Sequence, residues 1–181
     1  DDEGAEDRDD ALSLEIEPDD DAEDVAAAER GAVVYRIGIH IADAGALIPP
    51  DGAVDLEAAR RMATLYLPER RVTMLPPEVS NEKGSLAPNE TRAALSLLVR
   101  VTDSGEMLGW EVTPSAVRSR AALTYDEADR AMGDALHLWH DTLVSLERVA
   151  DCLRRKRMEA GAIAIERPEM VIKVTSGDVK V

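Results

Sequence analysis

Four strand-like segments that follow one another as two hairpins constrain the fold of this chain more than any other feature. In the first pair, residues 11–17 alternate apolar and polar side chains and residues 32–42 are β-rich, with a charged, alanine-rich connection between them. The second pair, residues 93–102 and 107–118, is joined by the turn sequence DSG at 103–105. Because neighbouring strands are expected to pair as hairpins, the sequence predicts antiparallel pairing in a sheet.

Three segments outside these strands have helical patterns. Residues 54–64 carry apolar side chains at helical spacing, with Asp51 as a candidate N-cap. Thr-x-x-Glu at 124–127 is a capping-box pattern, and a longer helix is expected from about residue 134 to residue 158, closed by Gly161. Strands and helices together predict an α+β fold in which a mixed or antiparallel sheet packs against helices.

A long segment, residues 66–88, contains four prolines and one glycine and is predicted to form an ordered loop or short strands. Loops of this length in compact domains are usually functional. Strand character returns at residues 163–165 and 170–174, and β-type residues flank a turn signal at 176–178. Since the chain starts inside an acidic cluster and stops just after this turn, we expect residues 1–181 to be part of a larger domain.

The charge balance and the single cysteine limit the functions open to the chain. Lys and Arg number 21 against 37 Asp and Glu, a formal net charge of -16, so an evenly charged surface would repel nucleic acid. A nucleic-acid role therefore requires metal ions in an acidic pocket or basic surface elsewhere. Cys152 has no partner for an internal disulfide, and no apolar run approaches the roughly 20 residues of a membrane helix. With an acidic N-terminus unlike a signal peptide, we expect a soluble, cytoplasmic protein.

Residues 1–10 (DDEGAEDRDD) crowd carboxylates together directly before the first predicted strand. Like charges a few ångströms apart raise one another's pKa, and hard divalent cations that prefer oxygen ligands relieve the repulsion. A phosphodiester is the matching substrate, because two such ions about 4 Å apart can activate water and neutralise the leaving oxygen. For an acidic run taken by itself, a solvated terminus is the favoured interpretation, whereas an EF-hand calcium loop would need a helix where a strand follows.

The spacing of four aspartates in this cluster is more specific than its charge. An Asp, five further residues and then Asp-x-Asp-Asp-Ala open the strand, with the aspartates at Asp1, Asp7, Asp9 and Asp10. In this spacing the chain resembles the ribonuclease II and ribonuclease R (RNB) family of 3′-5′ exoribonucleases. The similarity continues in order through IHIAD at 39–43, YLP at 66–68, MLP at 74–76, LAPNETR at 86–92, LTY at 123–125 and RRKRMEAGA at 154–162.

The resemblance implies a metal-dependent site at these aspartates. Asp1, Asp7 and Asp10 correspond to the carboxylates that hold Mg²⁺ around the scissile phosphate, with two ions in the active complex and Mn²⁺ able to substitute. Asp9 corresponds to the position that is essential for turnover and lies close to the terminal nucleotide. We therefore expect Asp9 to be catalytic and the other three aspartates to be metal ligands.

Two tyrosines resemble residues that contact RNA in the family. Tyr66 matches the aromatic that stacks on the base at the 3′ end, and Tyr125 matches a position near the terminal ribose. Two structural alternatives stay open, in which Tyr66 packs only against Pro68 and Tyr125 is a core residue at a helix entry. Many family members carry a further stacking aromatic after the long helix, where this chain has Ile165 and no Phe, so the sequence leaves open whether Ile165 replaces it.

Other polar residues have interpretations that do not involve catalysis. His40 stands in a strand among isoleucines and is expected to be hydrogen-bonded and partly buried. Asp43 either supports the acidic site or caps a turn. His137 and His140 form a potential metal pair, although a surface-to-core transition is the favoured interpretation. The basic run 154–157 either contacts RNA phosphates or complements the dipole at the end of the long helix.

The resemblance implies that residues 1–181 are the N-terminal half of an RNB catalytic domain. The expected activity is that of a monomeric, hydrolytic 3′-to-5′ exoribonuclease, which acts on the 3′ end of single-stranded RNA and releases nucleoside 5′-monophosphates by a two-metal-ion mechanism. The family's catalytic arginine and its flanking OB-type RNA-binding domains are expected outside this segment. The alternatives are a catalytically inactive RNB-like RNA-binding or regulatory module, and an acidic interaction domain unrelated to RNA.

Overall fold

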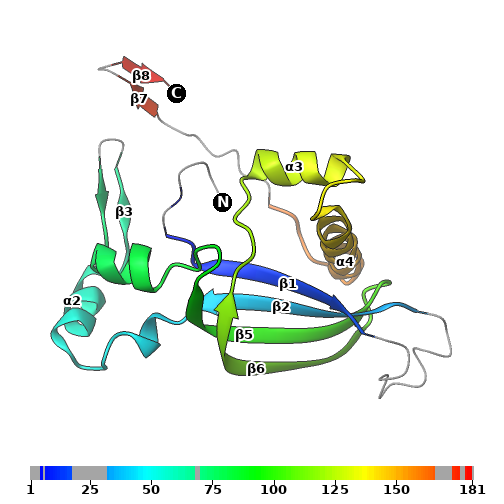
Figure 1. Cartoon of the computed structure of the whole chain (residues 1–181), viewed down its shortest axis with the longest axis horizontal. Helices are drawn as coiled ribbons and strands as arrows, with labels where there is room; N and C mark the ends of the chain where they lie inside the picture. The colour runs from blue at the N-terminus through cyan, green and yellow to red at the C-terminus, as the bar shows by residue number, and fades with distance from the viewer. Residues whose placement is uncertain are drawn as a thin grey trace.

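The computed structural model describes residue 5 and residues 7–17, 32–67, 70–165, 173–175 and 178–180. Predictions that concern Asp1, the connection at 18–31 and Pro68 fall outside these residues. Figure 1 shows one curved sheet, with helices over one face and a region of helix and short strands beyond one end. The predicted α+β class is confirmed.

The sheet consists of β1 (Asp10–Ile16), β2 (Val34–Ala42), β5 (Thr91–Thr102) and β6 (Met107–Arg118), in the spatial order β1-β2-β5-β6. Every neighbouring pair is antiparallel, so both predicted hairpins are confirmed, and the pairing of β2 with β5 joins them. Because strand directions alternate, β1 and β5 start at the end of the sheet where β2 and β6 finish (Figure 1).

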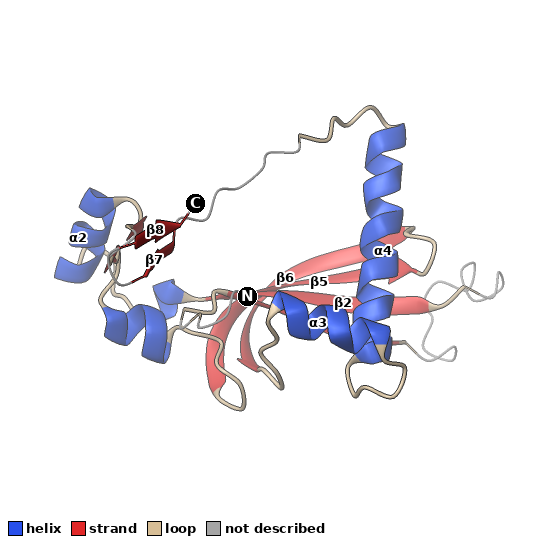
Figure 2. Cartoon of the chain, turned by 90° about the horizontal axis from the view of Figure 1, so that it is seen from above, coloured by secondary structure: helices blue, strands red, loops and turns tan. Residues whose placement is uncertain are grey.

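One face of the sheet forms the hydrophobic core with α4 (His140–Glu159). Alternation along the strands puts Tyr35, Ile37 and Val101 on this face, and Val149 of α4 packs against them. Figure 2 shows α4 running across the strands that carry these residues. Burying an aliphatic side chain contributes roughly 1.5–3 kcal/mol, so this contact decides where α4 lies.

The helix α3 (Tyr125–Gly133) begins with the predicted capping box. The Thr124 hydroxyl accepts from Glu127 N at 3.2 Å, and the Glu127 carboxylate accepts from Thr124 N at 2.9 Å. These bonds satisfy backbone groups that have no partner inside the helix. They fix Tyr125 as the first helical residue.

The long helix α4 starts at His140, later than the predicted start near residue 134. Asp134 has an extended backbone, and its carboxylate accepts from Leu136 N at 3.0 Å, which forms a turn in place of a helix. Gly161, with φ 95°, follows the end of α4 and closes it as predicted. Like the other helices in the described part of the chain, α4 does not combine the length and apolar character needed to cross a membrane.

The helix α2 (Ala53–Arg61) is preceded by Gly52, so the prediction that Asp51 is its N-cap is wrong. Asp51 adopts a left-handed backbone with φ 59°, and its N–H donates to the Asp55 carboxylate at 2.8 Å. Asp51 therefore takes part through its backbone N–H, and the carboxylate in this hydrogen bond is that of Asp55. The helix ends at Arg61 because Met62 turns left-handed, with φ 64°, before the predicted end at residue 64.

The proline-rich segment contains short strands, one of the two alternatives predicted for it, and a helical turn that was not predicted. β3 (Leu65–Tyr66) and β4 (Arg71–Val72) pair as a small antiparallel hairpin, and η3 (Glu78–Lys83) is a π-helical turn. η2 (Ala44–Ala46) is a single 3-10 turn after β2. This region lies beyond the end of the sheet at which β1 begins (Figure 1).

Near the C-terminus, the predicted strand at residues 163–165 is absent, and Ile163 and Ile165 are exposed instead. Neither residue has a neighbouring strand to pair with in the described ranges. β7 (Lys173–Thr175) and β8 (Asp178–Lys180) form an antiparallel pair, as the turn signal predicted.

Candidate active site

Backbone hydrogen bonds fix the acidic segment before it enters β1. Asp9 O accepts from Ala42 N at 2.8 Å at the end of β2, and Arg8 O accepts from Leu86 N at 2.9 Å. Arg8 N donates to the Ser85 hydroxyl at 3.1 Å, and both Ser85 and Leu86 are buried. The end of β2 and residues 85–86, which are far apart in the sequence, therefore fix the position of the backbone that carries the aspartates.

The carboxylates of Asp7 and Asp10 lie close enough to Asp9 to affect it electrostatically. Burial raises the pKa of the Asp9 carboxyl, and the negative charges of Asp7 and Asp10 raise it further. A carboxyl of this kind retains a proton more readily than an exposed aspartate, and a nearby cation would stabilise its charged form. The structure thus brings together three of the four predicted site aspartates, and Asp1 is outside the described residues.

The β3–β4 hairpin brings Tyr66 and Arg71 to one carboxylate. The two residues lie directly opposite each other across the hairpin. The Tyr66 hydroxyl donates to Asp7 Oδ2 at 3.4 Å, and Arg71 Nη1 donates to Asp7 Oδ1 at 2.9 Å. The charge of Asp7 is the largest cause of a raised pKa at the Tyr66 hydroxyl. Tyr66 therefore lies beside the acidic residues, while its contact with RNA stays a prediction.

Both candidate RNA-binding tyrosines are exposed to solvent. Tyr66 and Tyr125 are each 68% exposed, so the interpretation of Tyr125 as a core residue is wrong. The chain reaches Tyr125 from the end of β6, which is the end of the sheet at which Asp9 lies (Figure 1). The structure does not bring Tyr125 into hydrogen-bonding contact with the described aspartates. The alternative packing of Tyr66 on Pro68 concerns a residue outside the described ranges.

His40 is a structural residue, as predicted. Its ring is buried between Ser13 Oγ, 2.9 Å from Nε2, and Ser96 Oγ, 2.6 Å from Nδ1. Ser96 Oγ in turn lies 2.5 Å from Ser115 Oγ, so polar side chains form a ladder across β1, β2, β5 and β6. Burial lowers the pKa of His40. A Cβ atom at Gly38 would meet the imidazole and the Ser13 hydroxyl, which explains the glycine at this position.

Asp43 and the two later histidines have local structural roles. Asp43 Oδ1 accepts from Ala46 N at 3.1 Å, so of its two interpretations the structure shows the turn cap. His137 Nδ1 accepts from Trp139 N at 3.2 Å in the turn before α4. His140 is the first residue of α4, and its Nδ1 lies 3.2 Å from Ala131 O. The two histidines therefore do not share a helical face, and the potential metal pair gains no support.

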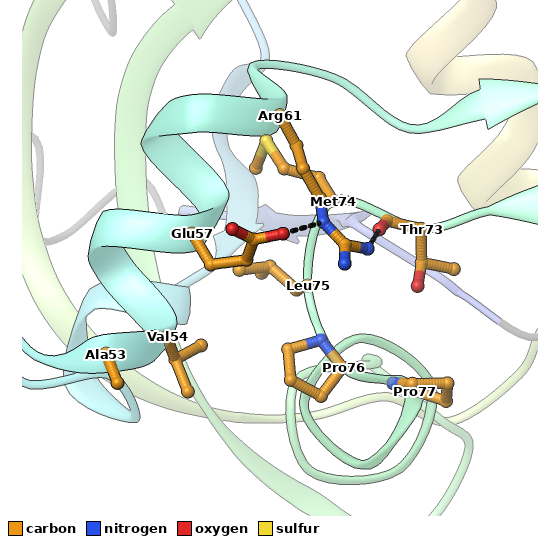
Figure 3. A pocket seen from close by; sticks show the side chains of 9 residues that line it. All are labelled: Ala53, Val54, Glu57, Arg61, Thr73, Met74, Leu75, Pro76 and Pro77. Carbon is orange, nitrogen blue, oxygen red and sulfur yellow. Dashed lines mark hydrogen bonds and ion pairs between the residues drawn. The ribbon is translucent and has the colours of Figure 1, made fainter.

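A mostly apolar pocket of about 410 Å³ lies apart from the aspartates, between α2 and residues 73–77 (Figure 3). Arg61 bridges its two sides, because Nε donates to Glu57 Oε1 and Nη1 donates to Thr73 O, each at 2.8 Å. Hydrogen bonds from Arg60 and Arg61 lower the pKa of Glu57 to about 2. Arg61 thus fastens the base of the β3–β4 hairpin to α2.

Comparison with known proteins assigns this arrangement to a family. The sequence profile described as RNB domain matches residues 1–181. This chain belongs to the RNB family. The resemblance to ribonucleases II and R that the aspartate spacing predicts is thereby confirmed.

Three relatives of this RNB chain illustrate the range of the family. Exosome complex exonuclease RRP44 of Homo sapiens is 35% identical over 154 residues, covering 83% of this chain and 16% of RRP44. "Inactive exonuclease DIS3L2" of Arabidopsis thaliana is 32% identical over 168 residues, covering 84% of this chain and 16% of that protein. The structure of Mycoplasma genitalium RNase R in complex with ribose methylated single-stranded RNA shares the fold, with a TM-score of 0.82 and 20% identity, over 98% of this chain and 26% of that one. The RNB chain therefore spans about a quarter or less of each relative.

The described acidic residues of the RNB chain fit a hard divalent cation in their chemistry. Carboxylate oxygens are the ligands that Mg²⁺ prefers in proteins, and the pKa of Asp9 is raised by burial and then by the negative charges of Asp7 and Asp10. Within the described ranges, no three His, Cys, Asp or Glu side chains are arranged to hold a metal ion. One oxygen of Asp7 is already bonded to Arg71. The ligand set of Asp1, Asp7 and Asp10 therefore stays a prediction.

Sequence reasoning missed one residue of this RNB site, Arg71. Arg71 lies 64 positions from Asp7 in the sequence, and the periodicity of neighbouring residues does not predict a hydrogen bond between residues so far apart. The available signal was the pair Arg70-Arg71, two adjacent cations in a strongly acidic chain, a few residues after the YLP motif.

Proposed function

We propose that this RNB chain is the N-terminal part of the catalytic domain of a hydrolytic 3′-to-5′ exoribonuclease that releases nucleoside 5′-monophosphates from single-stranded RNA. The observation that carries the proposal is the hydrogen bond that joins Tyr66 to Asp7, since it puts an exposed aromatic ring beside clustered carboxylates. An aromatic ring can stack on a base while carboxylates hold cations at the adjacent phosphate. The exonuclease name of the human relative supports the same activity.

The four aspartates would carry the chemistry. Asp1, Asp7 and Asp10 would hold two Mg²⁺ ions, or Mn²⁺ in their place, and such ions supply activation of water and neutralisation of the leaving oxygen. Asp9, whose pKa is raised by burial and by its acidic neighbours, would hold and move a proton at its carboxylate next to the terminal nucleotide. The RNB spacing and the proximity of Asp7, Asp9 and Asp10 support these roles.

Two tyrosines would bind the 3′ end of the RNA. Stacking on Tyr66 would contribute roughly 1–3 kcal/mol per base irrespective of base identity, which suits an enzyme that does not select sequence. Tyr125 would lie near the terminal ribose, where contact with the 2′-hydroxyl distinguishes RNA from DNA. Ile165, which is 79% exposed, would supply only an aliphatic contact.

Electrostatic repulsion is the main physical obstacle, because the chain carries a formal charge of -16. The basic run at the end of α4 offers limited compensation, since Arg154 pairs with Asp151 at 3.1 Å and Lys156 donates to Gly105 O at 2.7 Å. We therefore propose that RNA affinity comes from cations at the aspartates and from parts of the protein outside residues 1–181. We further propose a cytoplasmic monomer, and the free Cys152 suits a reducing compartment.

A cleavage assay with the full-length protein tests the activity. RNA labelled at its 5′ end and incubated with Mg²⁺ should shorten stepwise from the 3′ end, while a DNA strand of the same sequence should shorten far more slowly. Release of nucleoside 5′-monophosphates would identify the hydrolytic product. Cleavage at internal positions, or phosphorolytic release of diphosphates, would contradict the proposal.

A catalytically inactive RNA-binding module is the second candidate. The relative named as an inactive exonuclease, at 32% identity, makes this alternative specific. RNA that binds in a gel-shift assay but keeps its length with either Mg²⁺ or Mn²⁺ would favour the inactive module. Failure to bind RNA at all would leave an acidic interaction domain.

A further inference from the structure

Asp7 already has a cationic partner. Arg71 Nη1 donates to one carboxylate oxygen of Asp7 at 2.9 Å, and the Tyr66 hydroxyl donates to the other at 3.4 Å. Arg71 and Tyr66 are cross-strand neighbours in the β3–β4 hairpin, so one carboxylate holds both strands. The ion pair is partly exposed, with 36% of the Arg71 side chain and 21% of the Asp7 side chain accessible. Ion pairs of this exposure are individually weak, so another cation can replace the guanidinium.

We propose that Arg71 is an internal counter-cation of Asp7, and that a divalent cation displaces its guanidinium from the carboxylate, which loosens the β3–β4 hairpin and leaves Tyr66 beside the acidic residues. The inference rests on the proposed function in taking Asp7 to be a metal ligand. A divalent cation must approach a carboxylate oxygen directly, and a guanidinium bonded to that carboxylate repels it. The two cations therefore compete for Asp7.

The anchoring of the hairpin supports this coupling. Its base is fixed by two contacts that do not involve the aspartates: Arg61 Nη1 donates to Thr73 O at 2.8 Å, and Met74 N donates to the Thr64 hydroxyl at 3.1 Å. Each strand of the hairpin has only two residues, and two-stranded hairpins are marginally stable in water. The contacts of Arg71 and Tyr66 with Asp7 therefore add to the few contacts that hold the strands in place, and their loss would increase the mobility of the hairpin.

Cation affinity provides the first test. Mn²⁺ binding to the full-length protein is measured by isothermal titration calorimetry without RNA, for wild type, Arg71→Gln and Arg70→Gln. Arg70 is a matched control because it is exposed, adjacent and equally charged. Arg71→Gln should bind Mn²⁺ at least about fivefold more tightly than wild type, the lower end of coupling between competing ligands, and Arg70→Gln should change the affinity much less. Equal changes in the two variants would reveal a general charge effect and overturn the proposal, as would an absence of Mn²⁺ binding.

Hydrogen exchange of the peptide that covers residues 65–74 provides the second test. In the wild type, Mg²⁺ should accelerate exchange in this peptide, whereas in Arg71→Gln exchange should be fast without Mg²⁺ and change little on its addition. Unaltered or slower exchange in the wild type with Mg²⁺ would refute the displacement.

The RNA assay separates this inference from the proposed function. Stepwise RNA shortening together with unchanged hairpin exchange would overturn the role of Arg71 and leave the nuclease intact. Cation-dependent exchange without any RNA shortening would support the role of Arg71 and contradict the nuclease.

Discussion

The two ends of the sheet are stabilised by different forces. Under α4, Val101 and Val149 are each 1% exposed, and apolar burial holds the helix against Tyr35. At the opposite end, Asp7 is held by polar contacts with the hairpin that remain partly exposed. Apolar burial is insensitive to charge, whereas exposed polar contacts exchange with water and ions. The fold and the candidate site should therefore respond to separate perturbations.

The largest expected effect is at the acidic end. Asp9→Asn should reduce RNA shortening by about 10² to 10⁴-fold, the range for loss of a group that moves protons, while RNA binding in a gel-shift assay stays near wild type. The raised pKa of Asp9 means that its charged form is disfavoured in the folded chain, so the variant should also unfold at a somewhat higher temperature at neutral pH. Turnover like that of the wild type would remove Asp9 from the chemistry.

The core end should show the converse behaviour. Val149→Ala should lower the free energy of unfolding by roughly 2 kcal/mol in urea titrations, because it removes buried methyl groups that pack on the sheet. Leu136→Ala is the control, since Leu136 is 95% exposed and should change stability little. The Mn²⁺ affinity of folded Val149→Ala should match the wild type, and a large loss of affinity would contradict the separation of the two ends.

Tyr66 allows a finer distinction within the acidic end. Tyr66→Ala should change the length of the undegraded RNA stub, because it removes stacking worth roughly 1–3 kcal/mol. Tyr66→Phe is the matched control, which keeps the ring and loses only the hydroxyl that contacts Asp7. High-resolution gels of the final products measure the stub. The same stub in Tyr66→Ala and wild type would mean that the ring does not contact RNA.

The smallest expected effect concerns His40, which lies between the two regions. Burial lowers its pKa below the ordinary value of 6.5. The unfolded chain therefore takes up a proton at a higher pH than the folded chain, so this contribution to stability is complete above pH 6.5 and is lost as the pH falls. The stability difference between wild type and His40→Gln, measured in urea between about pH 5 and 8, should shrink toward acid. A difference that is constant with pH would contradict this.

Local patterns predicted the sheet but not the connections around it. Alternation and a turn sequence are properties of neighbouring residues, so both hairpins and the capping box at Thr124 followed from the sequence. The predictions of where α4 starts and of which residue caps α2 were wrong. Asp134 and Asp55 form side-chain hydrogen bonds to backbone N–H groups, and helical spacing does not predict such bonds.

The candidate site was predicted through spacing and resemblance, and its contacts were not. The aspartate pattern identified the family, yet the bond of Arg71 to Asp7 depends on how a hairpin 64 positions away folds back. The same holds for His40, whose partners Ser13 and Ser96 come from two other strands. Such contacts depend on tertiary structure, so one sequence without its fold does not reveal them.

The polar ladder through Ser13, His40, Ser96 and Ser115 also limits how the strands can align. Side chains alternate between the two faces of a sheet, so a shift of one residue in register would turn the serine or histidine of that strand toward the apolar face. A buried hydrogen-bond donor or acceptor would then have no partner. Misaligned sheets are therefore disfavoured by chemistry as well as by shape. Because β1 continues directly from the aspartates, the same bonds set how far those carboxylates project beyond the sheet.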